Sequence, residues 1–185
     1  MKSYSAVGVI LKRRNFSEAD RIITIFTKYH GKIYAIAKGV RKITSRKAPS
    51  LEPFTLCKLF IVSGKNLDII TETELISSFP SLRKNLKSVT LAYEICEMID
   101  RLLPEKQINR SLFELIINSF NALNDPQQKM ETSNQEEVLM KILWDLGYLP
   151  ENRSLHGVEL SNFIENILEK KLKSRQLLTK IEQLI

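Results

Sequence analysis

The periodicity of the sequence changes at Pro80, and this change constrains the fold more than any other feature. Before Pro80, five short segments rich in Ile, Val, Thr, Tyr and Phe are separated by turn signals at Gly31, Pro49 and Gly64, which predicts β-strands. The predicted strands cover residues 3–12, 21–28, 32–38, 55–63 and 68–79. Five strands in so short a stretch need their edges closed, which favours a five-stranded β-barrel of the OB type, with an SH3-like barrel as the alternative.

After Pro80, apolar residues recur at helical spacing. Ser133 and Glu136 match a capping box, so their side chains are expected to satisfy free amides at a helix start. The predicted helices cover residues 86–103, 112–123, 133–146, 160–172 and 175–184. Strands followed by helices predict an α+β chain, with an OB-type barrel domain at 1–79 and an α-helical domain at 80–185.

Positive charge is concentrated near the amino terminus. The first fifty residues hold twelve Lys and Arg but only two acids, Glu18 and Asp20, whereas the remaining residues hold sixteen basic and nineteen acidic side chains. The formal net charge of the whole chain is +7. A basic segment joined to a mildly acidic remainder predicts a directed positive surface, for which nucleic acid is the commonest partner. The simpler interpretation is a set of solvated lysines.

Three groups of residues are candidates for this surface. Arg13 and Arg14 are expected to close the first strand and to begin the turn that contains Phe16, while Arg21 opens the second strand. The third group follows the third strand, in a segment too polar to fold alone. A mobile basic loop on a barrel rim can follow phosphates without fixed side-chain geometry. The predicted binding residues are Arg13, Arg14, Arg21, Lys38, Gly39, Arg41, Lys42, Arg46 and Lys47.

Aromatic residues near these charges add a second way to hold a nucleic acid. Phe16, Tyr29 and Tyr34 could stack on unpaired bases, although packing in the core or at the rim is the simpler interpretation for each. Phe26 lies among apolar residues and is expected in the core, as is Trp144 in a helix.

Patterns typical of enzymes are weak. Neither His30 nor His156 has a neighbour at metal-ligand spacing, so no metal is expected. Glu18 and Asp20 could act as an acid–base pair, but their position beside Arg21 favours a structural ion pair. Without a phosphate-binding glycine-rich loop or a nucleophile motif, the chain is predicted not to be an enzyme and to need no cofactor.

The sequence also carries signals of its compartment. It contains no run of about 18 apolar residues, so no membrane-spanning helix is expected. The apolar start is too short for a signal peptide, which favours the cytoplasm. Cys57 and Cys96 lie in apolar surroundings and are expected to be buried, reduced thiols.

Seven stretches occur in an order that a known family shares. They are ADRIITIFTKYHGK (19–32), AIAKGVRK (35–42), LEPF (51–54), LISSFPSLR (75–83), YEICEMIDRLLP (93–104), LGYLP (146–150) and LKSR (172–175). Together they resemble the RecO family of bacterial recombination mediators and DNA-repair proteins.

The resemblance implies an OB barrel on a helical domain, binding of single- and double-stranded DNA, strand annealing, and help in loading RecA at gaps. It implies RecR and the acidic tail of single-stranded DNA-binding protein as partners, RecA as an indirect one, and a cytoplasmic, nucleoid-associated location without membrane contact. The family's lysine–glycine–arginine segment maps to Lys38, Gly39, Arg41 and Lys42. Looser matches are Arg14, Arg21, Arg46 and Lys47.

One segment departs from the family pattern. Many RecO proteins carry a four-cysteine zinc finger soon after the stretch that matches 146–150, whereas residues 151–157 contain no cysteine. The chain therefore resembles a shortened variant without the finger, and zinc is not expected. Partner binding is instead expected at basic residues of the last helices, namely Lys170, Lys171, Lys173 and Arg175.

Other classes of function remain as alternatives. An adaptor would recruit repair partners through its helical domain while the barrel contributes little affinity for DNA. An OB-fold RNA-binding factor would use the same basic barrel on another nucleic acid. A nucleic-acid hydrolase is the least favoured, because no cluster of carboxylates or histidines predicts a metal site.

Overall fold

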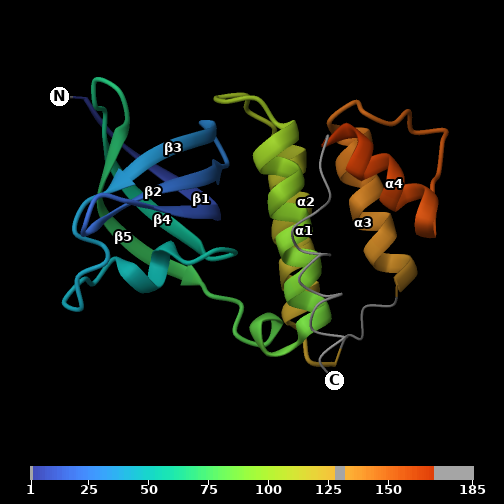
Figure 1. Cartoon of the computed structure of the whole chain (residues 1–185), viewed down its shortest axis with the longest axis horizontal. Helices are drawn as coiled ribbons and strands as arrows, with labels where there is room; N and C mark the ends of the chain where they lie inside the picture. The colour runs from blue at the N-terminus through green and yellow to red at the C-terminus, as the bar shows by residue number, and fades with distance from the viewer. Residues whose placement is uncertain (1, 128–131, 169–185) are drawn as a thin grey trace. The chain divides into compact units, whose positions relative to one another are not determined.

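The structure, a computed structural model, describes residues 2–127 and 132–168. Within this part a closed five-stranded barrel comes first and four α-helices follow, which confirms the predicted α+β class (Figure 1). The strands are β1 (Ser3–Phe16), β2 (Asp20–Thr27), β3 (Gly31–Ala37), β4 (Leu56–Val62) and β5 (Asp68–Ser77). The helices are α1 (Leu86–Leu102), α2 (Arg110–Asn124), α3 (Thr132–Asp145) and α4 (Gly157–Ile167), with short 3-10 turns η1 (Ala48–Leu51) and η2 (Leu82–Lys84).

Strand β1 pairs with two partners in succession. Its first half is antiparallel to β4 and its second half is antiparallel to β2, with an irregularity of register between Ile10 and Lys12. Beside this point, the Ile10 amide donates to the Thr55 carbonyl over 3.0 Å and the Phe54 amide donates to the Ile10 carbonyl over 2.8 Å. An extra residue bends and twists a strand. β1 can therefore leave β4 and continue with β2.

This continuation corrects one prediction about the first strand. The sequence pattern ended the strand at Lys12, with Arg13 and Arg14 closing it and beginning the turn, but the ladder with β2 runs on to Phe16. The polar end was misleading because a two-stranded ribbon with one exposed face accepts charged residues as readily as a turn does.

The barrel closes in the order β1-β2-β3-β5-β4, which is the five-stranded arrangement of an OB fold and excludes the SH3-like alternative. The seam between β3 and β5 is parallel and short, since it joins only Ala35 to Asp68 and Ile36 to Ile69. The other pairs are antiparallel.

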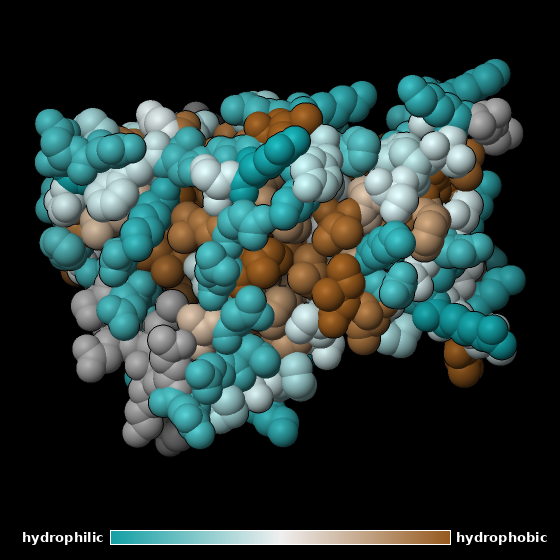
Figure 2. Space-filling view, turned by 180° about the vertical axis from the view of Figure 1, so that it is seen from behind, coloured by the Kyte–Doolittle hydropathy of each residue, from teal (hydrophilic) through white to brown (hydrophobic). Residues whose placement is uncertain are grey.

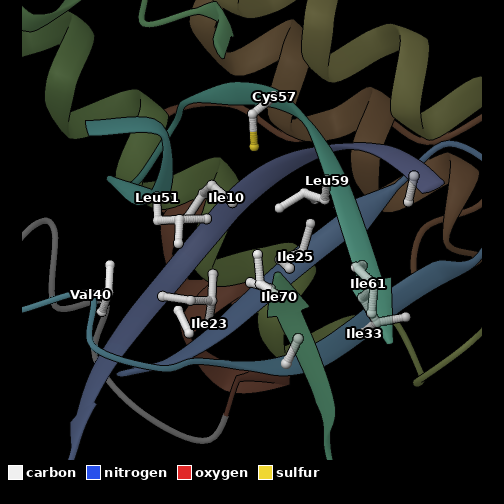
Figure 3. Packing of buried hydrophobic residues seen from close by; sticks show 13 residues of the cluster. Ile10, Ile23, Ile25, Ile33, Val40, Leu51, Cys57, Leu59, Ile61 and Ile70 are labelled. Carbon is white, nitrogen blue, oxygen red and sulfur yellow. The ribbon is translucent and has the colours of Figure 1, made fainter. Parts of the chain in front are cut away.

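The core of the barrel is formed by alternate residues of the strands, as a pleated sheet with one buried face requires (Figure 3). Cys57 belongs to it, and burial raises the pKa of its thiol to about 12. Cys57 and Cys96 are both buried free thiols, as predicted. The buried cluster comprises Ala6, Ile10, Ile23, Ile25, Ile33, Ala35, Ala37, Val40, Leu51, Cys57, Leu59, Ile61 and Ile70.

The chain divides into two compact units. The segment Leu103–Phe113 groups with the barrel residues up to Ser78, and Phe79–Leu102 groups with the later helices. In the barrel unit, the Lys106 amide donates to the Lys32 carbonyl over 2.9 Å, and the ring centroids of Phe26 and Phe113 lie 5.7 Å apart. The domain boundaries at 1–79 and 80–185 stay a prediction.

In the helical unit, the predicted capping box involves Ser133, whose side chain lies outside the described part, so the box stays a prediction. Helix α3 already includes Thr132, and the Glu136 carboxylate accepts a hydrogen bond from the Gly157 amide over 3.0 Å, at the start of α4. Glu136 therefore holds the start of the next helix. Trp144 is only half-buried and its indole donates to the Arg153 carbonyl over 3.1 Å, which corrects its assignment to the core.

The predicted helix at 160–172 begins three residues early as α4, and residues beyond 168, with the helix at 175–184, lie outside the described part. Among the described residues, no helix combines the length and apolar character needed to cross a membrane. Figure 2 shows hydrophobic side chains interspersed among hydrophilic ones on one face of the molecule.

The turn at Gly31 generates a test of the fold. Gly31 has a φ of +66°, and a Cβ there would lie 2.4 Å from the Gln107 carbonyl oxygen. Gly31→Ala combines left-handed strain with a backbone clash, so its free energy of unfolding should fall by about 2–4 kcal/mol in urea titrations. Gly157 is the matched control, since its φ is +55° but nothing lies within 4 Å of the added Cβ. Gly157→Ala should lose only about 1 kcal/mol, and equal losses would contradict the packing of Leu103–Phe113 on the barrel.

Candidate nucleic-acid interface

The basic residues singled out in the sequence lie at one end of the barrel. Arg21 in β2 pairs with Ala37 in β3, so the end of β3 lies beside the β1–β2 turn. The segment 38–47, here called the basic loop, leaves β3 at this point. Its Arg41 amide donates to the Ala19 carbonyl over 2.9 Å, and the Arg41 guanidinium donates to the Ser17 carbonyl over 3.1 Å. The loop is therefore attached to the β1–β2 turn.

The basic loop is built from two successive turns rather than from a free chain. The Lys42 amide donates to the Gly39 carbonyl over 3.2 Å, and the Ser45 amide donates to the Lys42 carbonyl over 2.9 Å. Val40 in the first turn is only 1% exposed and belongs to the barrel core, together with Leu51 after the loop (Figure 3). Burying a valine side chain contributes about 1.5–3 kcal/mol, which holds the loop against the barrel.

Asp20 holds the first turn of the basic loop. Its carboxylate accepts a hydrogen bond from the Gly39 amide over 2.8 Å. Gly39 itself has a φ of +66°, a conformation that favours glycine. The residue that the sequence placed in the binding site thus shapes the loop, and its amide is already engaged.

Lys47 holds the far end of the basic loop. Its ammonium donates to the Ile70 carbonyl in β5 over 3.1 Å. Burial lowers the pKa of Lys47, and the nearby Asp20 carboxylate partly opposes this shift. Apolar and hydrogen-bonding contacts to the barrel thus hold the loop at both ends, while its predicted mobility stays a prediction.

Arg13 and Arg21 share an acidic partner that the sequence reasoning missed. Arg13 forms an ion pair with Glu52, and Arg21 lies 3.6 Å from the same carboxylate while its Nε donates to Asn15 over 3.2 Å. The predicted ion pair of Arg21 with Glu18 or Asp20 is wrong. Neighbouring residues of a strand point to opposite faces, so Asp20 and Arg21 face apart.

The same alternation separates Arg13 from Arg14. Arg13 lies opposite the core residue Ile23 and shares its face of the ribbon, whereas Arg14 lies opposite Ile22 on the other face. The nine predicted residues therefore share an end of the barrel but not a single face.

Four of the nine are exposed cations without a hydrogen bond or ion pair to any described residue. We call Arg14, Lys38, Lys42 and Arg46 the unpaired cations. Arg13, Arg21, Arg41 and Lys47 instead contact protein groups, and these contacts position the surface.

The three candidate aromatic residues are spread over the barrel. Phe16 is exposed at the end of β1, beside the basic loop's attachment point. Tyr29 lies in the β2–β3 turn at the other end, with the Arg110 guanidinium 4.7 Å from its ring centre. Tyr34 is half-buried in β3. Phe26 is fully buried, as predicted.

The described residues include no group of three or more His, Cys, Asp and Glu placed to hold a metal ion. The His30 ring packs 4.7 Å from the Tyr4 ring, and His156 lies 3.2 Å from the Glu136 carboxylate. The predicted partner-binding residues Lys170, Lys171, Lys173 and Arg175 lie outside the described residues.

Fold and charge together define the class. The chain is an OB-fold protein with a helical unit, and one end of its barrel presents cations that form no ion pair with an acid of the described residues.

Comparison with known proteins gives the family. The model of "Recombination protein O N terminal" matches residues 1–79, and that of "Recombination protein O C terminal" matches residues 83–156. The chain belongs to the RecO family, as the sequence stretches indicated.

Three relatives, each named DNA repair protein RecO, show the extent of the similarity. Identity is 35% with that of Pelotomaculum thermopropionicum, 32% with that of Symbiobacterium thermophilum and 36% with that of Heliobacterium modesticaldum. The alignments cover 81%, 81% and 82% of this chain, and 57%, 59% and 54% of the relatives. The chain thus spans less than two thirds of their length.

The role of Asp20 in holding the loop is testable. Asp20→Ala leaves the Gly39 amide without its charged acceptor, so the free energy of unfolding should fall by about 1–2 kcal/mol. Urea titrations at neutral pH measure this loss. Glu18→Ala is the control, because Glu18 is an exposed acid of the same turn without a hydrogen bond to any described residue. It should cost less than about 0.5 kcal/mol, and similar losses for both variants would refute the anchoring role.

Proposed function

We propose that this chain binds single- and double-stranded DNA through the basic loop and promotes annealing of complementary strands as a recombination mediator in DNA repair. The observation that supports this is the set of unpaired cations at one barrel end, on a chain whose relatives are named DNA repair proteins. A cation that already pairs with a carboxylate gains little free energy when it meets a phosphate. An unpaired cation retains its full attraction for the phosphate.

Annealing of this kind needs positive charge rather than a reactive group. Two strands repel each other through their phosphates, and cations that neutralise both backbones lower that repulsion so that bases can meet. If all four unpaired cations contact phosphates, the log–log dependence of affinity on salt should have a slope of about −3.6 for duplex and about −2.8 for single strands. The function proposed here is non-enzymatic.

The partners follow from the family and not from the described residues. We infer RecR, the acidic tail of single-stranded DNA-binding protein and, indirectly, RecA at gaps, with a place in the cytoplasm near the nucleoid. The residues that the sequence assigns to partner binding, Lys170, Lys171, Lys173 and Arg175, lie outside the described part. Annealing of DNA coated with single-stranded DNA-binding protein, with and without its acidic tail, tests this inference.

The role of positive charge in the basic loop can be tested with a double variant. Lys38→Gln with Lys42→Gln removes two unpaired cations, so affinity for single-stranded DNA should fall about tenfold at low salt and the salt slope should shrink by about 1.4. Fluorescence anisotropy at several salt concentrations measures both quantities, and RNA of the same sequence tests the alternative ligand.

The matched control is Lys84→Gln with Lys87→Gln, which removes the same charge from exposed lysines of the helical unit. Affinity and slope should then stay close to the parent values. If both double variants lose the same affinity, general charge explains binding, and the basic loop is not the site.

Glu52 offers a test in which the affinity for DNA should rise rather than fall. Glu52→Gln frees Arg13 and Arg21 from their shared carboxylate, so DNA should bind more tightly and with a steeper salt slope. The unfolding free energy should fall by about 0.5–1 kcal/mol, because the pair is partly exposed and screened. Glu137→Gln, which removes the acidic partner of Lys141 on α3, is the control and should leave DNA affinity unchanged. Weaker binding by Glu52→Gln would contradict this assignment.

A further inference from the structure

The outermost residue of the basic loop is a hydrophobic one. Ile43 has a relative exposure of 105%, against 1% for Val40 three residues earlier. Both occupy the second position of a hydrogen-bonded turn, Val40 in the turn from Gly39 to Lys42 and Ile43 in the turn from Lys42 to Ser45. The two turns thus direct one apolar side chain into the barrel and the other into solvent.

Single exposed apolar residues are common, so exposure alone carries no function. Ile43 differs from the other exposed apolar residues in its surroundings. Ile43 directly follows the unpaired cation Lys42 in the chain. A second unpaired cation, Arg46, comes just after the turn from Lys42 to Ser45. A phosphate chain held by these cations would bring its bases against the isoleucine.

The loop beneath Ile43 is fixed in several places. Val40 is buried in the core, the Arg41 amide bonds to Ala19, and Lys47 bonds to Ile70. An apolar side chain presented on a supported turn loses little conformational freedom when it meets a ligand. Architectural DNA-binding proteins use apolar side chains, isoleucine among them, as wedges between neighbouring bases of a duplex.

We propose that Ile43 contacts bases directly, inserting between neighbouring bases of a strand whose phosphates the unpaired cations hold. The inference rests on the proposed DNA binding and adds a ligand class to it, namely unpaired or loosely stacked bases. Unstacking costs least where bases are not already paired, so the contact favours single strands over duplex. The contact also keeps each base apart from its stacking neighbour. The base is then available to a complementary strand.

The test uses the full chain and short single-stranded DNA with one 2-aminopurine, whose fluorescence rises when its base is unstacked. Ile43→Ser should weaken binding about fivefold to tenfold and abolish the fluorescence rise. Its salt slope should stay that of the parent, because no charge is altered. Ile43→Leu keeps an apolar side chain and should retain both affinity and the fluorescence rise.

Val158→Ser is the matched control, because Val158 is 75% exposed but lies at the start of α4 in the helical unit. It should bind and unstack DNA as the parent does. If Ile43→Ser also does so while Lys38→Gln with Lys42→Gln still weakens binding, the inference is wrong and the proposed function stands. If neither set of changes alters binding, both are wrong.

Discussion

The change of partner by β1 is the constraint on which the rest of the structure depends. Ile10 gives both its amide and its carbonyl to the chain at Phe54 and Thr55, so β1 stays joined to the β4 side up to that residue. Beyond it, β1 is free to follow β2 as a ribbon. The turn of this ribbon supplies the carbonyls and the Asp20 carboxylate that accept hydrogen bonds from the basic loop. The bulge therefore helps to provide the support on which the loop rests, together with the buried Val40 and the bond from Lys47 to Ile70.

Acidic residues give this basic end its organisation. Asp20 and Glu52 each bind protein groups, one a loop amide and the other two guanidinium groups. Together with the carbonyls that bind Arg41 and Lys47, they divide a cluster that looks uniform in the sequence into cations that hold the fold together and cations that remain available to a ligand. Net charge alone cannot make that distinction, since both kinds count equally in it.

The sequence was sufficient for the elements and the barrel class, because short β-branched strands and helical periodicity depend on local patterns. It placed the basic residues at one end for the same reason, since turns and strand ends are local too. It did not show which arginine faces which side, because a bulge shifts the alternation by one residue. It also missed Glu52, thirty-one residues from Arg21, since ion pairs across a barrel depend on register. Ile43 carried a signal, an apolar residue in a polar loop, which acquires meaning only once Val40 is seen to be buried.

The segment Leu103–Phe113 has a consequence for how the chain can be divided. Its amide at Lys106 pairs with Lys32 in β3, and Phe113 covers the ring of Phe26. A fragment cut after the last strand would expose this ring and leave part of the β3 edge open to other chains. Such a fragment would tend to self-associate, so an isolated barrel needs a piece of sequence from beyond the first long helix.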